Sequence, residues 1–142
     1  MNLQKFTIKA QEAVQEAVLC AQRQGQQAIE PEHLLSSILK VGEQVTQFIF
    51  QKLGVSQKAV SQALEAQIGS LPRVQGGEPY LSRTTNDVLL KAEELLRLEE
   101  QRRLAEEEKH LAEQKRLEEE RRRADERRRE EVGTHDGGAY GA

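Results

Sequence analysis

The chain has 142 residues, of which 32% are charged and only 4% are aromatic, and its net charge is -3. The single cysteine, Cys20, excludes an intrachain disulfide, and no apolar run approaches the ~18 residues of a membrane span. The slightly acidic balance argues against a general attraction to nucleic acid, and residues 1–10 lack the apolar core of a secretory signal. We therefore expect a soluble, cytoplasmic protein with one ordinary domain.

The charge is concentrated in the second half of the chain. Residues 91–131 contain 15 of the 24 acidic residues and 13 of the 21 basic residues. This distribution predicts three segments. An apolar-patterned domain covers residues 1–96, a charged helix covers 97–132, and a disordered, Gly-rich tail covers 133–142.

Two helices are predicted near the N-terminus. Thr7 is placed to cap a helix that runs to about Gln24, because a threonine hydroxyl accepts hydrogen bonds from the free N–H groups of a first turn. Pro31 begins the second helix, where its missing N–H is tolerated, and Gly42 closes it. The apolar face of the first helix is Val14, Ala17, Val18 and Ala21, and that of the second is Leu34, Leu35, Ile38 and Leu39.

Two more helices and a loop follow. The third helix ends at Gly54, and Ser56 caps the fourth. The third carries the apolar residues Val45, Phe48, Ile49 and Leu53, and the inward face of the fourth is predicted to be Ala59, Val60, Ala63, Leu64 and Ile68. The segment from Gly69 to Tyr80 is dense in glycine and proline, which predicts a loop.

Ser82 caps a fifth helix with the apolar residues Val88, Leu89, Ala92, Leu95 and Leu96. No convincing alternation of apolar and polar residues indicates a strand. The predicted fold class is therefore all-α, a bundle of short helices that continues into a long charged helix.

The fifth helix has no stop signal, because neither glycine nor proline occurs from Leu81 to Val132. Opposite charges four residues apart support it, in the pairs Glu93–Arg97, Glu99–Arg103, Glu118–Arg122 and Glu119–Arg123. Its leucines thin to about one per heptad, whereas a dimeric coiled coil needs two apolar positions. They are Leu98, Leu104, Leu111 and Leu117. We expect a solvated single helix, and self-association as a coiled coil is the alternative.

Four segments carry a family resemblance: MNLQKFTIKAQEAVQEAV, QQAIEPEHLLSSILK, FQKLGV and YLSRTTNDVLLKAEEL. In this order, over residues 1–96, they resemble the N-terminal domain of the Clp family of AAA+ unfoldases, ClpB disaggregase type. The resemblance implies two similar four-helix repeats. It also implies partners: unfolded or aggregated substrates, adaptor proteins and the full-length Clp ring. The phosphate-loop pattern G-x-x-x-x-G-K-[ST] is absent from this sequence, so no enzyme activity and no cofactor are expected.

The sequence departs from the family pattern after Leu96. The first repeat is complete, with EHLL at residues 32–35, but the second repeat is incomplete, since charged sequence stands where its remaining helices belong. The surface that those helices would cover is then exposed, and each Å² of apolar area left in water forgoes about 25 cal/mol of stabilisation. Either the long helix folds back to cover part of this surface through the leucines near the boundary, or another chain covers it. Those leucines are Leu95, Leu96, Leu98 and Leu104.

Protein-binding residues are predicted on this surface. The resemblance implies that Thr7 borders the peptide groove of the family, in addition to its role as a helix cap. We add apolar residues from the first, third and fifth helices: Val14, Phe48, Phe50, Leu95 and Leu96. No catalytic, cofactor-binding or metal-binding residue is predicted.

Structural roles are predicted for the other reactive side chains. His33 has no second ligand at metal-binding spacing, so it is expected to cap or pack at the start of its helix. Cys20 lies beside an apolar stripe and is expected to be a small buried hydrophobe, because the sequence places no histidine to activate it. Glu30 and Glu32 flank Pro31, where carboxylates favour the helix dipole.

The arginine triplets at residues 121–123 and 127–129 do not predict nucleic-acid binding. Acidic residues interleave with them, which removes the basic stripe that phosphate contacts require. No aromatic residue lies among them to stack on bases, and the balanced charge also argues against a membrane-surface helix.

The function predicted from the sequence is a non-catalytic protein-binding module of a ClpB-type chaperone, acting in protein quality control and the stress response. Two alternatives remain. One is a structural or oligomerising protein that acts through its charged helix. The other is a truncated gene product in which a frameshift replaced the second repeat, an idea motivated by the abrupt change of composition at about Arg97.

Overall fold

The computed structural model describes residues 2–139, with side chains placed through residue 133. Contacts divide the chain into two units, Met1–Leu95 and Leu96–Ala142. This division falls one residue before the boundary expected from composition.

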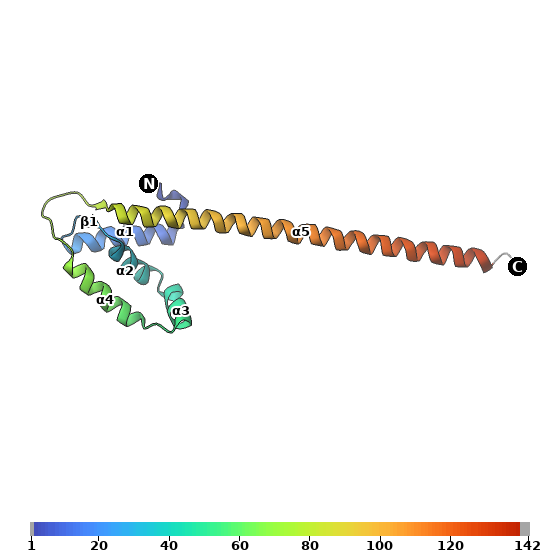
Figure 1. Cartoon of the computed structure of the whole chain (residues 1–142), viewed down its shortest axis with the longest axis horizontal. Helices are drawn as coiled ribbons and strands as arrows, with labels where there is room; N and C mark the ends of the chain where they lie inside the picture. Colours follow the sequence, from blue (N-terminus) through green and yellow to red (C-terminus); the bar gives the residue numbers. More distant parts are fainter. Residues whose placement is uncertain (1, 140–142) are drawn as a thin grey trace. The chain divides into compact units, whose positions relative to one another are not determined.

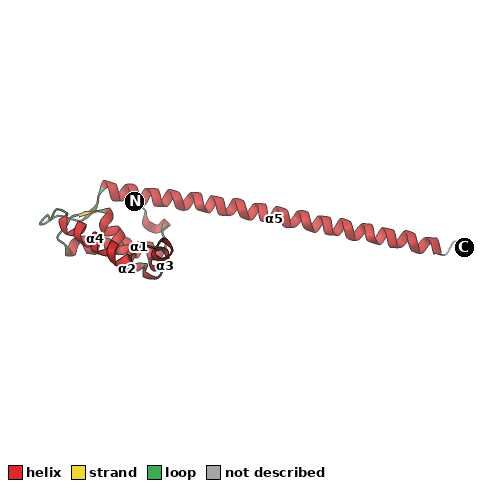
Figure 2. Cartoon of the chain, turned by 60° about the horizontal axis from the view of Figure 1, so that its bottom comes forward, coloured by secondary structure: helices red, strands yellow, loops and turns green. Residues whose placement is uncertain are grey.

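Helices dominate both units, which confirms the predicted all-α class (Figures 1 and 2). The elements in chain order are η1 (Leu3–Lys5), α1 (Ile8–Arg23), β1 (Ala28–Ile29), α2 (Pro31–Val41), α3 (Glu43–Leu53), α4 (Gln57–Ser70), β2 (Tyr80–Leu81) and α5 (Arg83–Ala139). The two strands pair in parallel, with Ala28 opposite Tyr80 and Ile29 opposite Leu81. The sequence did not predict them, because two residues are too few to show an alternating pattern.

The predicted helix caps are confirmed. The Thr7 hydroxyl accepts a hydrogen bond from the Ala10 N–H at 3.1 Å, and α1 begins at the next residue, Ile8. Ser56 and Ser82 accept in the same way from the N–H groups three residues on, at 3.3 and 3.1 Å. Gly54 ends α3 with φ of 67°, a left-handed conformation that glycine adopts without a side-chain clash.

The core lies where α1 packs against α2. Its buried cluster is Val14, Ala17, Ala21, Ile29, Leu34 and Leu89. Ala17 and Ala21 are fully buried, and their small side chains allow the neighbouring backbone to approach closely. Leu89 brings the first turns of α5 into this core, so these turns belong to the folded domain.

A buried polar network links the segments around the core. Thr85 of α5 is fully buried, and its hydroxyl donates to the carbonyl of Ile29 at 2.7 Å. The N–H of Ser82 donates to the same carbonyl at 3.1 Å. On the other side, the Gln26 amide donates to the carbonyl of Ile68 at 2.5 Å. These bonds join residues 42 and 56 positions apart in the chain, and so they hold α4 and α5 to the central segment.

Several apolar residues of the predicted helices are exposed to solvent. On α3 the residues Val45, Phe48, Ile49 and Leu53 face solvent, and the buried residue of that helix is Thr46. Ala59 and Ala63 of α4, which were predicted to face inward, are exposed, and this corrects the prediction for α4. The other exposed apolar residues are Leu35 and Ile38 of α2 and Val88, Ala92, Leu95 and Leu96 of α5. The physical reason is that an apolar stripe is buried only where another element packs against it.

Ion pairs lie along the charged part of α5, as expected, but with other partners than those predicted. Arg102 pairs with Glu99 and with Glu106, the latter at 3.1 Å. Fourteen residues further on, Arg116 repeats this arrangement with Glu113 at 2.5 Å and Glu120 at 3.5 Å. Each of these arginines therefore holds carboxylates one turn before it and one turn after it.

The leucines of the charged helix do not form a seam. Leu98, Leu104, Leu111 and Leu117 are separated by steps of six and seven residues, and each is about half exposed. Such steps turn a helix by about 240° and 340°, so the leucines wind around α5. This arrangement supports a single solvated helix over the coiled-coil alternative.

The end of α5 differs from the predicted disordered tail. The backbone remains helical from residue 133 to Ala139, where an irregular segment was expected. A helix that is already formed gains one hydrogen bond for each residue that it adds, which offsets part of the cost of each glycine. The rest of the predicted tail, residues 140–142, lies outside the described residues.

Candidate protein-binding surface

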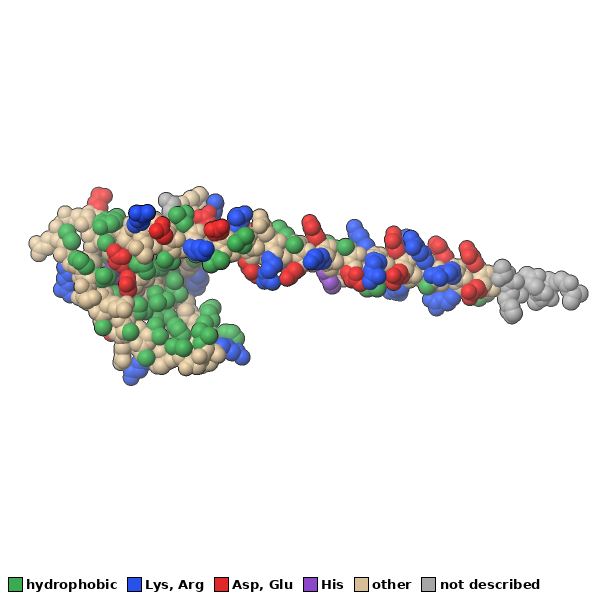
Figure 3. Space-filling view, viewed as in Figure 1, with side chains coloured by type: hydrophobic (Ala, Val, Ile, Leu, Met, Phe, Trp, Pro, Cys, Tyr) green, Lys and Arg blue, Asp and Glu red, His purple; other side chains and the backbone are tan. Residues whose placement is uncertain are grey.

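An exposed apolar surface covers parts of α2 and α3 in the first unit. We call it the α2–α3 face and define it by Leu35, Ile38, Val45, Phe48, Ile49 and Leu53. The four residues from α3 recur at the spacing of one helical face, and the side chains of Val45, Phe48 and Leu53 are 64%, 60% and 67% exposed. Figure 3 shows hydrophobic side chains gathered over these two helices. The sequence revealed the apolar stripe of the third helix and predicted that Phe48 binds protein, but it did not link the stripe to Leu35 and Ile38 of α2.

Phe48 is the largest side chain of the α2–α3 face. The Lys52 ammonium lies 5.6 Å from the centre of its ring, which is a cation–π distance. Phe50, also predicted to bind protein, is only partly exposed and lines a shallow hollow between α3 and α4 together with Val55.

The other predicted binding residues differ in their accessibility. Val14 is only 7% exposed and packs in the core, so it is removed from the binding set. Thr7 is exposed, but its hydroxyl is engaged as the cap of α1. Leu95 and Leu96 are both more than half exposed on α5. An ion pair of 2.8 Å between Lys5 and Glu93 holds the N-terminal segment against the part of α5 that precedes Leu95.

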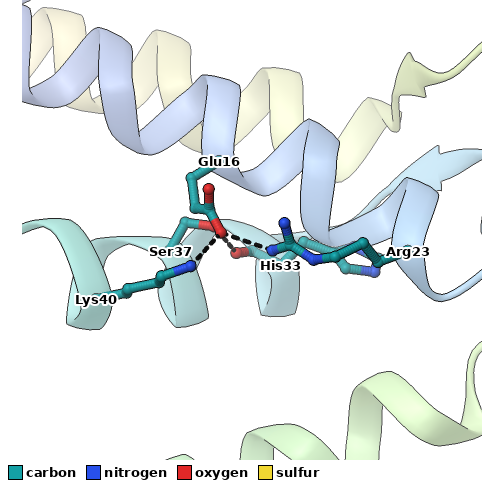
Figure 4. Close-up of polar contacts among 5 residues, drawn as sticks. All are labelled: Glu16, Arg23, His33, Ser37 and Lys40. Carbon is teal, nitrogen blue, oxygen red and sulfur yellow. Dashed lines mark hydrogen bonds and ion pairs between the residues drawn. The ribbon is translucent and has the colours of Figure 1, made fainter.

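A carboxylate on α1 neutralises two cations, Arg23 and Lys40. One oxygen of Glu16 accepts from Arg23 at 2.6 Å and from Lys40 of α2 at 2.8 Å (Figure 4). The hydrogen bonds from Lys40 and then Arg23 hold the pKa of Glu16 below its ordinary value. The three charges fasten α1 to α2, and the engagement of both cations argues against an anion site here.

His33 has the capping and packing role predicted for it. It is fully buried, its Nδ1 accepts from the Glu30 N–H at 2.9 Å, and its Nε2 lies 2.6 Å from the Gln26 side-chain oxygen. These partners require a neutral ring with the proton on Nε2. Burial also lowers the pKa of His33, which favours the neutral form. Because both ring nitrogens have structural partners, neither is free for acid–base chemistry.

Among the side chains that the structure places, the remaining reactive groups do not assemble a chemical site. Cys20 is half-buried, and burial raises the pKa of its thiol, which keeps it protonated and a poor nucleophile. Among the described residues, the acidic, histidine and cysteine side chains nowhere gather in threes as a metal ion would require. Within the same part of the chain, no helix is both long enough and apolar enough to span a membrane.

Comparisons with known proteins identify the family of the domain. Residues 5–112 match the family described as the Clp repeat (R) N-terminal domain. Over 94 residues, 66% of this chain, the sequence is 61% identical to the chaperone protein ClpB of Bacteroides thetaiotaomicron and 50% identical to that of Porphyromonas gingivalis. It is 32% identical over 99 residues to the ClpB of Nitratidesulfovibrio vulgaris.

These matches cover only 11% of the length of each of the three relatives. The family match at residues 5–112 includes the α2–α3 face. The chain therefore belongs to the Clp repeat N-terminal domain family, and its domain is of the ClpB type.

Proposed function

We propose that this chain is a non-catalytic protein-binding module of a ClpB-type chaperone, which docks apolar segments of unfolded or aggregated proteins on the α2–α3 face. Adaptor proteins that present an apolar helix would use the same face. The observation that carries the proposal is that α3 keeps its apolar stripe in water. Membership in the family supports the association with chaperones.

The size of the face supports a binding role. Its six side chains together expose about 500 Å² of apolar area, since a large aromatic or aliphatic side chain contributes on the order of 100–200 Å² when fully accessible. Exposed apolar patches of about 300–600 Å² are the largest that soluble monomers usually carry, and they are often functional. Exposure of this kind favours contact with other apolar surfaces, because burial is worth about 25 cal/mol per Å².

The chemistry of the face also favours binding over catalysis. Its six members are leucine, isoleucine, valine and phenylalanine, which provide neither a nucleophile nor a proton donor. A segment of an unfolded protein offers similar side chains and needs no fixed sequence to match them. Recognition by apolar contact therefore suits a chaperone with many clients, and a cytoplasmic setting stays the prediction made from the sequence.

Substitution of the face tests this function. The full chain would be titrated with fluorescently labelled casein, a client that lacks stable structure, and binding would be measured by fluorescence anisotropy. The double variant Phe48→Ser/Leu53→Ser is expected to weaken casein binding about tenfold or more, because two anchors of the face are lost.

The matched control is Leu90→Ser, because Leu90 is 54% exposed in the same unit but lies on α5, outside the face. This variant is expected to bind casein as the parent chain does. If the parent chain does not bind casein, or if both variants lose binding equally, the assignment to the α2–α3 face is incorrect.

A further inference from the structure

The α2–α3 face has a geometry that suits pairing with itself. We propose that a second copy of this chain covers the face, through antiparallel packing of α3 against α3 across a two-fold axis near Ile49. The resulting dimer is a resting state that clients must open. This inference rests on the proposed function only for the role of the dimer, since the pairing itself follows from the apolar surface.

The spacing along α3 is compatible with a two-fold axis. With the axis at Ile49, Val45 of one copy lies opposite Leu53 of the second copy, and Ile49 lies opposite itself. The apolar residues at positions 45, 48, 49 and 53 form a continuous row along a helix of 11 residues, about 16 Å long. Two such rows can interdigitate as helices do in globular cores.

The charge on the face does not oppose the pairing. The basic residue of α3 is Lys52, which lies beside the row of apolar residues. Its ammonium lies over the Phe48 ring. Antiparallel packing about Ile49 places the two Lys52 residues on opposite sides of the axis, each about 5 Å along the helix from it. At a separation of about 9 Å, close to the screening length at physiological salt, their repulsion is small.

The area suits a weak dimer in particular. Burial of the whole α2–α3 face, about 500 Å² on each copy, gives at most about 1,000 Å² in total, which is the lower limit for a specific protein interface. Obligate dimers bury at least about twice that area. We therefore expect a reversible dimer at micromolar or higher concentration, which an apolar client at sufficient concentration displaces from the same face.

The oligomeric state of the full chain tests the inference. Sedimentation velocity from low micromolar to millimolar concentration is expected to show a shift from monomer to dimer. Ile49→Glu places two carboxylates at the axis and is expected to abolish the dimer. Leu111→Glu is the matched control, because Leu111 is 50% exposed on the charged part of α5 and is expected to leave the dimer intact.

A cross-linking variant gives an independent readout if Ile49→Glu alters the fold. Ile49→Cys in a Cys20→Ser background is expected to form a disulfide-linked dimer with oxidised glutathione as the oxidant, whereas Leu111→Cys in the same background is not. A chain that stays monomeric throughout, or a dimer that Leu111→Glu dissolves and Ile49→Glu does not, overturns the inference. Casein binding is measured separately, so a monomer that still binds casein leaves the proposed function standing.

Discussion

The two units of this chain are stabilised in different ways. In the first unit, residues far apart in the sequence are joined by burial and by hydrogen bonds such as those from Thr85 to Ile29 and from Gln26 to Ile68. In the second, nearly every side chain placed by the structure is exposed, and the ion pairs that the structure shows span three or four residues. The first unit should therefore unfold cooperatively, whereas the charged helix should respond to change only locally.

The largest effect is expected from opening a cavity in the core of the first unit. Leu34→Ala removes a buried side chain from the contact between α1 and α2 and should lower the free energy of unfolding by about 2–5 kcal/mol. Urea denaturation with hydrogen exchange resolved by segment would measure the loss. Leu111→Ala on the charged helix is the control and should leave exchange in α1 and α2 unchanged. Equal effects of the two changes would contradict the contrast between the units.

A smaller effect is expected from the buried threonine of α5. Thr85→Val keeps the shape of the side chain but removes the hydroxyl that donates to the Ile29 carbonyl and accepts from Ser82. The free energy of unfolding should fall by about 1–2 kcal/mol, and exchange should rise first at Tyr80 and Ser82. Thr84→Val alters the neighbouring exposed threonine and should be nearly neutral. If Thr85→Val leaves the free energy of unfolding unchanged, the hydrogen bond from Thr85 to Ile29 does not hold α5 to the domain.

Mild acid should weaken the first unit through His33. Because burial lowers its pKa, the folded state binds a proton less readily than the unfolded state, whose pKa is about 6.5. The stabilisation is thus complete above about pH 6.5 and is lost progressively as the pH falls below that value. A proton on Nδ1 would also place two donors, this N–H and the N–H of Glu30, against each other, and their hydrogen bond would be lost.

Urea midpoints measured between about pH 7 and pH 5 would test this dependence, and His33→Gln should flatten it. The lowered pKa of Glu16 acts in a separate range, since its contribution is lost only as the pH falls below about 4.5. A parent chain whose urea midpoint does not change over the upper range would contradict the role assigned to His33.

The smallest effect is expected on the charged helix. Raising the salt concentration screens the pairs of Arg102 and Arg116 and should reduce helicity at 222 nm by a small fraction, without changing the cooperative unfolding of the first unit. Arg102→Gln should lower helicity slightly at low salt and remove part of its salt dependence. A cooperative, concentration-dependent loss of the helix would instead indicate a coiled coil.

The capped helix boundaries could be predicted from the sequence because they depend on local geometry, whereas the end of α5, which has no cap signal, could not. Thr7, Ser56 and Ser82 cap helices through bonds to the N–H group three residues on, and Pro31 and Gly54 act through their own backbone. The long helix could be predicted for the same reason, since it needs only helix-forming residues and neighbouring charges. The capping role of His33 also fits this local logic, but its bond to Gln26 could not be foreseen.

The sequence by itself thus determined the helices, their capped ends and the family, because each of these is recorded in residues that are close together in the chain. Only the tertiary structure decided that Val14 is buried while Phe48 is exposed, and that Thr85 joins α5 to β1. The helices of Val14 and Phe48, α1 and α3, carry apolar stripes of the same kind, and the periodicity of the sequence alone does not show which stripe is buried. Burial depends on which element packs across each stripe, and that partner comes from a distant part of the chain or from another molecule.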